Sequence, residues 1–215
     1  MGKPLNRSSV AKMLAEFAAP ICVFVVLLCA VNASAQAAKD IWHLDPAHSS
    51  AQFSVRHMGI STVRGAFDKV SGEVKYSPSN PADSSINVTI DANSVDTRVA
   101  MRDNDLRGPD FLDVAKYPTI TFKSKHVEVA GAGNLKVTGD LTIHGVTKEV
   151  VLDVDGPSAP MNDQMGNLHA GASATTKINR QDFGVSGAGT MVGNELQIVI
   201  DVELVQRVSP PPPNK

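Results

Sequence analysis

Residues 95–124 read VDTRVAMRDNDLRGPDFLDVAKYPTITFKS and interrupt a chain that elsewhere alternates apolar and polar residues. The first part of this stretch predicts a short charged helix within residues 96–113, with Asp96 as the candidate N-cap. Gly108-Pro109 ends the helix, and Tyr117-Pro118 returns the chain to an extended conformation. The pattern therefore predicts strands with one short helical insert between them.

Period-two alternation on both sides of the insert predicts β-strands. Ile86, Val88 and Ile90 share one face of such a strand, and polar residues occupy the positions between them. The same pattern recurs in residues 51–55, 119–123, 135–143, 150–154 and 196–204, and a weaker strand of small residues covers 170–178. His144-Gly145 has the length of a two-residue hairpin turn. About eight antiparallel strands predict an all-β sandwich or closed barrel.

The N-terminal segment has the features of a signal peptide. Lys3, Arg7 and Lys12 precede an apolar run over residues 21–31, which is too short for a transmembrane helix of about 20 residues. The small residues 33–35 then form a cleavage site, so we predict a signal peptide over 1–35 that is cleaved after Ala35. The mature protein is expected to be periplasmic or secreted, without an integral membrane anchor.

Two other readings of this segment remain open. The apolar run could stay attached as a membrane anchor, or Cys29 could carry a lipid, although the preceding Leu28 is larger than lipid attachment favours. Cys22 and Cys29 are the two cysteines of the chain, so cleavage leaves no thiol for a disulfide or a thiolate metal site.

The mature chain is expected to form one domain, over residues 40–207, followed by a disordered proline-rich tail over 208–215. Removing three basic residues and one acidic residue leaves 17 basic against 21 acidic side chains, a net charge of −4. A mildly acidic chain without a basic block argues against a nucleic-acid partner.

The polar residues predict no catalytic or metal site. The six histidines lack the spacing of known metal-binding motifs. The charged residues of the insert alternate in sign, which is typical of a solvated, ion-paired surface. Residues 184–188 approach a nucleophile elbow but have Ala188 where the second glycine belongs. We therefore predict a protein that is not an enzyme, with no catalytic residue, no metal and no cofactor.

Apolar chemistry remains, and it favours a hollow barrel. The mature chain has one Trp, two Tyr and five Phe, so its inward positions are mostly aliphatic or small. Such a barrel either packs its interior or holds one ligand, such as an acyl or prenyl chain. The candidate lining residues, each of which could equally be ordinary core, are Phe53, Val55, Met58, Ile60, Phe67, Ile86, Val88, Ile90, Phe111, Phe122, Leu141, Ile143, Phe183, Leu196, Ile198 and Ile200.

An ordered series of motifs over about residues 42–205 resembles the YceI-like family of exported lipid- and polyisoprenoid-binding proteins. The motifs are Asp45-Pro46-Ala47-His48-Ser49, Phe53-Ser54-Val55-Arg56-His57, Gly65-Ala66-Phe67, Val95-Asp96-Thr97, Arg102-Asp103, Leu106-Arg107, Asp110-Phe111-Leu112, Lys116-Tyr117-Pro118, Gly139-Asp140-Leu141-Thr142-Ile143-His144-Gly145-Val146-Thr147-Lys148 and Asn179-Arg180-Gln181-Asp182-Phe183-Gly184.

The resemblance implies a lipocalin-like, eight-stranded antiparallel β-barrel around a long isoprenoid, quinone-like or other lipid, without catalysis. The first-strand region and the insert would flank the pocket. Met101 and Asp105 stand where the family pattern has an acid and a histidine, which leaves head-group contacts open. The alternatives are a filled, structural or stress-response barrel that acts through protein contacts, and an enzyme acting on a lipid-like substrate. A homodimer is compatible with each.

Overall fold

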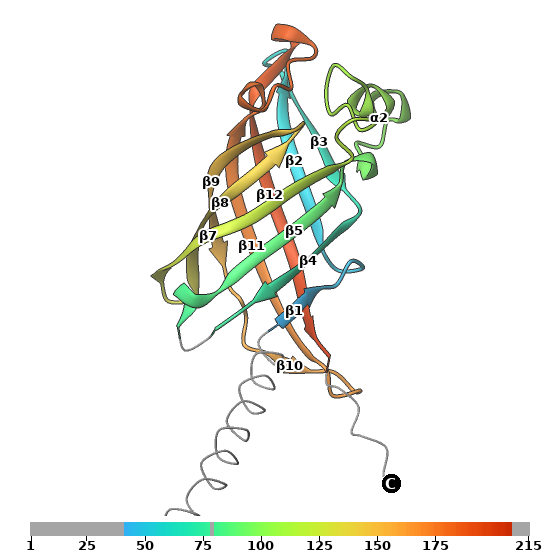
Figure 1. Ribbon diagram of the computed structural model, residues 1–215. Helices are drawn as coiled ribbons and strands as arrows, with labels where there is room; N and C mark the ends of the chain where they lie inside the picture. The colour runs from blue at the N-terminus through green and yellow to red at the C-terminus, as the bar shows by residue number, and fades with distance from the viewer. Residues whose placement is uncertain (1–40, 78–79, 208–215) are drawn as a thin grey trace, which may run out of the picture. The chain divides into compact units, whose positions relative to one another are not determined.

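The structure is a computed structural model that describes residues 41–77 and 80–207. The predicted signal peptide over 1–35 and the tail over 208–215 lie outside the described residues. The described part is an antiparallel β-barrel with one short helix at one end (Figure 1). No helix among the described residues is both long and apolar enough to cross a membrane.

The strands follow the alternating runs of the sequence. They are β1 (Ile41–Leu44), β2 (Ser50–His57), β3 (Ser61–Phe67), β4 (Val70–Lys75), β5 (Ser85–Asp91), β6 (Val95–Asp96), β7 (Thr119–Gly131), β8 (Asn134–Ile143), β9 (Val146–Asp155), β10 (Met161–Asn162), β11 (Leu168–Asn179) and β12 (Val192–Gln206). Short 3-10 turns occupy Pro81–Asp83, Ala92–Ser94, Arg180–Phe183 and Gly189–Met191.

Eight of these strands close the barrel, as the resemblance implied. The order β1, β4, β5, β7, β8, β9, β11, β12 returns to β1, and every pairing is antiparallel. Two strands share one edge of the long strand β12. Leu204 and Val205 pair with β1, and residues within Val192–Asp201 pair with β2. The β2–β3 hairpin therefore extends the wall beyond β1 (Figure 1).

The predicted hairpin between β8 and β9 is confirmed. His144 and Gly145 both adopt positive φ, at 51° and 74°, as a two-residue type I′ turn requires. Gly145 has a second reason to lack a side chain, because a Cβ there would meet the Tyr117 ring at 2.4 Å. Tyr117 also contacts the His144 ring edge to face, with centroids 4.7 Å apart. This packing fixes the chain where it leaves the insert.

The helix α2 (Ala100–Arg107) starts later than the sequence predicted. Val99 holds the N-cap position and makes no side-chain capping bond, so Asp96 is not the cap. The Asp96 carboxylate instead accepts the N–H of Arg98, in a turn where Arg98 has φ of 64°. Because of this backbone turn, the helix begins about one helical turn later than predicted. Gly108 follows the last residue of the helix, as expected.

Arg180 holds together the end of the barrel at which α2 lies. Its side chain is 4% exposed and donates to five backbone carbonyls, those of Val185, Gly187, Gly189, Val192 and Gly193. Desolvation lowers the pKa of this guanidinium. The planar guanidinium directs its N–H groups toward carbonyls of a loop and of the start of β12. One buried cation therefore holds residues 185–193 in place.

Candidate ligand-binding cavity

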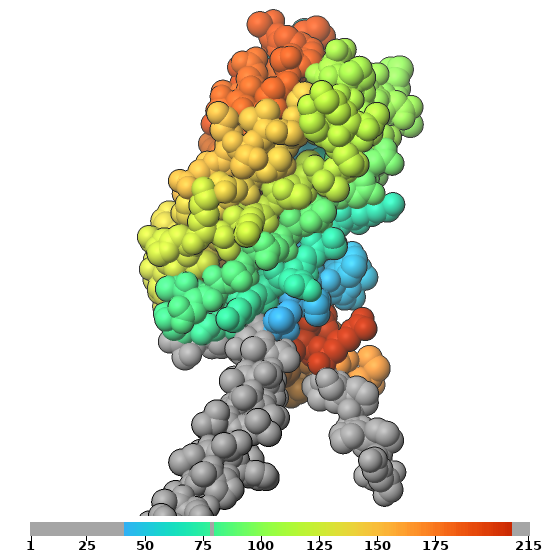
Figure 2. All heavy atoms as spheres, viewed as in Figure 1, coloured from blue at the N-terminus to red at the C-terminus, as the bar shows by residue number. Residues whose placement is uncertain are grey.

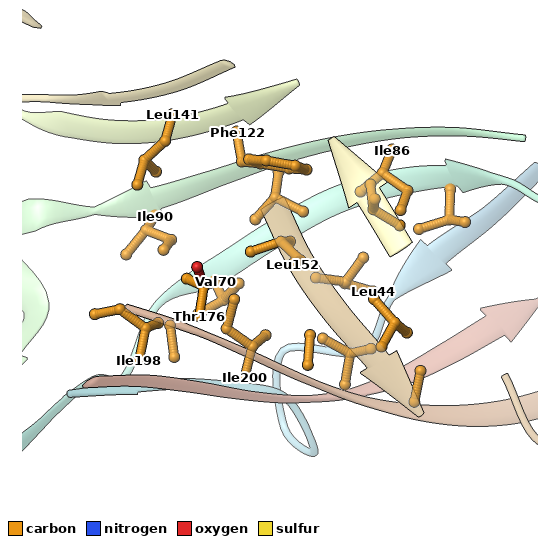
Figure 3. A pocket seen from close by; sticks show the side chains of 18 of the residues that line it. Leu44, Val70, Ile86, Ile90, Phe122, Leu141, Leu152, Thr176, Ile198 and Ile200 are labelled. Carbon is orange, nitrogen blue, oxygen red and sulfur yellow. The ribbon is translucent and has the colours of Figure 1, made fainter. Parts of the chain in front are cut away.

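A cavity of about 180 Å³ lies inside the barrel (Figure 3). Its lining runs from Leu44 and Leu204 at one end to Ile143 and Ile178 at the other. On β12 the lining positions from Ile198 to Leu204 span about 20 Å of strand. Among the described residues that line it, none is charged. Figure 2 shows that side chains cover the outer surface of β4, β5, β7 and β8.

Small side chains on β11 leave the interior open. Three alanines face inward there, and each is paired with a larger residue of β12: Ala170 with Leu204, Ala172 with Val202, Ala174 with Ile200. Val202 and Ile200 point into the barrel yet are only partly buried. The buried residues also form three separate clusters, around Leu44, Val137 and Phe183, instead of one continuous core. The barrel is therefore hollow between these clusters.

Glycines let two phenylalanine rings lie against the wall. A Cβ on Gly139 would meet the Phe122 ring at 2.6 Å, and one on Gly65 would meet the Phe53 ring at 2.5 Å. The rings therefore cover the glycine backbone of the neighbouring strands, β8 and β3. Phe53 also packs against Phe67, with ring centroids 5.8 Å apart.

The lining includes most of the residues that the sequence nominated. Those that line the cavity are Phe53, Phe67, Ile86, Val88, Ile90, Phe122, Leu141, Ile143, Ile198 and Ile200. Their contact with a ligand stays a prediction, because the placement shows only that they face the space.

Six nominated residues lie elsewhere. Phe111, Phe183 and Leu196 pack with Ile178 at the α2 end, and Phe111 lies against Gly187. Val55 lies on β2 outside the lining set. Met58 and Ile60 occupy the β2–β3 turn, where they are 59% and 79% exposed. Met58 and Ile60 lie beyond the end of β2 at His57, and their apolar character alone did not show that they belong to an exposed turn.

The structure adds lining residues that the sequence analysis did not single out. Most follow from the same alternation on strands whose inward face had been recognised: Leu44, Ala51, Val70, Val74, Tyr76, Ile120, Val127, Leu135, Val137, Val150, Leu152, Val154, Ala172, Ala174, Ile178, Val202 and Leu204. Thr176 shares this inward face of β11, but a search for apolar residues could not single it out because its side chain is polar. Its position on β11, opposite Ile198, places a hydroxyl among aliphatic neighbours (Figure 3).

Three charged residues of the insert form hydrogen bonds within the protein. This corrects the sequence-based interpretation that the charges form a solvated, ion-paired surface. Asp103 is buried and accepts hydrogen bonds from the backbone N–H and the hydroxyl of Thr97, and the hydroxyl bond is the main cause of its lowered pKa. Arg102 donates to the Thr97 hydroxyl and carbonyl. Arg107 donates to the carbonyls of Asn93 and Val95. These bonds attach α2 to the segment before it.

A second polar network lies at the opposite end, on the outer face of the barrel. His48 Nδ1 lies 2.7 Å from Asp45 Oδ2 and 3.9 Å from Glu203 Oε2. His169 continues the chain, with Nδ1 2.7 Å from Glu203 Oε1 and Nε2 3.2 Å from Asp163 Oδ2. The network borders an open groove of about 750 Å³ on the outer side of β11 and β12.

Hydrogen bonding shifts the pKa of each end of this network. The bond from His48 lowers the pKa of Asp45, and the same bond raises the pKa of His48. Glu203 is the main cause of the raised pKa of His169. The side chain of Asn167, together with its backbone N–H, is the main hydrogen-bonding cause that lowers the pKa of Asp163 to about 2. Asp45, His48 and Glu203 each offer a ligand atom, all within 4.8 Å of one another.

Comparison with known proteins gives consistent matches over the barrel. A family model described as the YceI-like domain matches residues 42–204. A UPF0312 protein of Vibrio cholerae is 41% identical over 167 residues, covering 77% of this chain and 88% of the relative. A second UPF0312 protein, from Yersinia pestis, is 38% identical over 159 residues, 74% of this chain and 82% of the relative.

Solved structures share the fold. BcnA of Burkholderia cenocepacia superposes with a TM-score of 0.65 at 30% identity, over 76% of this chain and 99% of that one. A YceI protein of Campylobacter jejuni gives a TM-score of 0.64 at 33% identity, over 71% and 90%. A polyisoprenoid-binding domain from Saccharophagus degradans gives 0.55 at 18% identity, over 77% and 98%, which shows a common fold alone.

Proposed function

Because this chain belongs to the YceI-like domain family, we propose that it binds a long-chain amphiphile, a polyisoprenoid, quinone-like molecule or related lipid, in the barrel cavity. The observation that carries the proposal is the hollow interior lined by uncharged, mainly aliphatic side chains. The Saccharophagus degradans neighbour is named for polyisoprenoid binding, and the ligand class proposed for this chain rests on its own cavity.

The shape of the cavity favours a linear chain. A volume of 180 Å³ that extends along about 20 Å of strand forms a narrow tunnel, which suits a flexible hydrocarbon better than a fused-ring molecule. Longer or thicker chains require the lining side chains to change rotamer. The β11 alanines are the positions at which the tunnel has the most room to accept them.

Transfer energetics set a minimum chain length. Each buried methylene contributes about 0.8 kcal/mol, so ten contribute about 8 kcal/mol. Association costs about 4–15 kcal/mol in lost translational and rotational freedom. Affinity therefore requires a ligand with more than about ten apolar carbons in the tunnel. Such a chain is larger than the cavity of about 180 Å³, so the lining side chains must change rotamer to admit it. The uncharged lining offers no acid–base pair to such a chain, so we propose a binding role without a catalytic step and without a cofactor.

We also propose that the protein acts in the periplasm or outside the cell, after cleavage behind Ala35. The charged start, short apolar run and small residues of the N-terminal segment support this proposal. The N-terminal sequence of the protein recovered from its source organism tests it, and a recovered chain that still begins at Met1 contradicts it.

Blocking the tunnel tests the binding proposal. Ala174→Phe adds a ring inside the barrel opposite Ile200, whereas Thr175→Phe makes the matched addition on the exposed outer face of the same strand. We expect Ala174→Phe to lower affinity for a fluorescent prenol at least tenfold and Thr175→Phe to leave it within twofold. Circular dichroism verifies that both variants are folded. Equal affinity in both variants contradicts binding inside the barrel.

A further inference from the structure

The polar network outside the barrel contains a group of residues that the lipid cavity does not use. Asp45 begins the turn between β1 and β2, and His48 closes it, with the His48 N–H bonded to the Asp45 carbonyl. Glu203 projects outward from β12 beside this turn. The backbone N–H of Asp45 donates to the Glu203 carbonyl at 2.8 Å, so the turn is attached directly to the strand. The fold thereby brings together three side chains that are far apart in the sequence.

Each carboxylate has one oxygen already engaged and one directed at His48. Asp45 Oδ1 accepts the N–H of Ala47 at 2.9 Å, which leaves Oδ2 facing His48 Nδ1 at 2.7 Å. Glu203 Oε1 accepts from His169 at 2.7 Å, which leaves Oε2 at 3.9 Å from His48 Nδ1. Three donor atoms therefore converge, and the remaining atoms of both carboxylates are held by partners.

We propose that Asp45, His48 and Glu203 bind one zinc ion on the outer face of the barrel. The three donors lie within 4.8 Å of one another, and a tetrahedral zinc site needs donors roughly 3.4 Å apart. Small side-chain rotations close this difference, and His48 is free to make them because its side chain is 64% exposed. The ion takes the place of the hydrogen bond that now joins His48 to Asp45.

The donor chemistry favours zinc over calcium and magnesium. One imidazole with two carboxylates is a mixed nitrogen and oxygen set that suits zinc, whereas calcium and magnesium prefer six or more oxygen donors. Three protein ligands leave the fourth tetrahedral position to water or to a molecule in the adjoining groove. The site is thus able to present a coordinated ion to an anionic group of a partner or small molecule.

Two further residues position the site. His169 donates to the distal oxygen of Glu203, and Asp163 bonds the other nitrogen of His169. Asp163 is itself held by the N–H groups of Met165 and Asn167. Hydrogen bonds of this kind orient the metal ligands in zinc proteins, and their loss typically weakens metal affinity by about 10–100-fold. His169 and Asp163 are therefore assigned as positioning residues.

Zinc titration of the purified, untagged full chain by isothermal calorimetry tests the proposal, with zinc chloride alone as the probe. The variants are His48→Ala and Glu203→Gln, and the matched control is His126→Ala, which removes another exposed histidine paired with a glutamate, Glu128. All three variants retain Cys22 and Cys29, so zinc bound by those thiols contributes equally. Circular dichroism establishes that each variant is folded.

We expect the wild type and His126→Ala to bind one zinc ion with equal affinity at this site. His48→Ala and Glu203→Gln are expected to weaken that binding at least tenfold, while fluorescent prenol binding stays unchanged in both. The proposal is overturned if the wild type binds zinc only with a dissociation constant above about 100 μM. It is also overturned if His48→Ala binds zinc as tightly as His126→Ala. Loss in His48→Ala with full retention in Glu203→Gln overturns the three-ligand assignment.

Discussion

At the scale of single residues, paired glycines and phenylalanines shape the cavity wall. Phe122 lies over Gly139 and Phe53 lies over Gly65, on neighbouring strands in each pair. A side chain on either glycine forces the ring away from the wall and into the tunnel. The size of the tunnel therefore depends on residues that have no side chain of their own to contribute.

Gly139→Ala is predicted to destabilise the barrel by about 1–3 kcal/mol, the usual cost of overpacking a core. The new Cβ would lie 2.6 Å from both the Phe122 ring and the Lys123 carbonyl. Gly171→Ala is the control, because at Gly171 the nearest atom to a new Cβ is a carbonyl oxygen 3.8 Å away. Urea unfolding measures both free energies, and equal losses in the two variants contradict this account.

At the scale of elements, the segment from Val95 to α2 is held by polar contacts. The helix has eight residues, which is too short to be stable alone. Asp103, Arg102 and Arg107 compensate by bonding the backbone and the hydroxyl of the residues before the helix. The charges of Arg102, Asp103 and Arg107 are therefore structural, and the exposed Met101 and Asp105 take no part in these bonds.

Thr97→Val tests that anchoring. The variant keeps the side-chain shape and removes the hydroxyl that bonds both Asp103 and Arg102. Because Thr97 and Asp103 are buried, the loss is expected to cost about 1–3 kcal/mol in the free energy of unfolding. Thr175→Val, at an exposed position on β11, should change stability by less than about 0.5 kcal/mol. Similar values for the two variants would show that the Thr97 hydroxyl is not an anchor.

The loop between β10 and β11 depends on the ionised form of Asp163. Its carboxylate accepts hydrogen bonds from Met165, Asn167 and His169, and its pKa is lowered from 3.8 to about 2. A lowered carboxyl pKa adds stability that is complete above pH 3.8 and is lost as the pH falls toward 2.

The stability difference between the wild type and Asp163→Asn should therefore shrink as the pH falls from 5 to 2. Urea unfolding at a series of pH values measures this difference, and the comparison cancels the titration of acids common to both proteins. A difference that stays constant over this range would mean that the charge of Asp163 does not hold the loop.

At the scale of the whole molecule, alternation predicted most of the β-strands, and ten of the sixteen residues nominated from the sequence line the cavity. Ile86, Val88 and Ile90 could be placed inside because a period of two assigns every second residue to one face. Met58 and Ile60 lie in an exposed turn after β2, and alternation along that strand gave no basis for placing them inside. The YceI-like resemblance added the closed barrel, which alternation alone did not distinguish from a sandwich.

Long-range polar contacts could not be predicted from the sequence. Asp45 and Glu203 are brought together by the pairing of β1 with β12, and no local spacing indicates this contact. The anchoring of α2 was missed for a related reason. Alternating charges look alike whether they pair in solvent or bond backbone carbonyls, and only the path of residues 93–97 decides between the two.

The central claim is that the barrel is a container for a lipid, and native mass spectrometry of protein purified from its source organism tests it most directly. We predict a bound species that adds a fixed mass, that solvent extraction releases as an amphiphile with more than ten apolar carbons, and that Ala174→Phe lacks while Thr175→Phe retains. Repeated recovery of wild-type protein at the mass of the bare chain would contradict the claim and favour a barrel that acts through protein contacts.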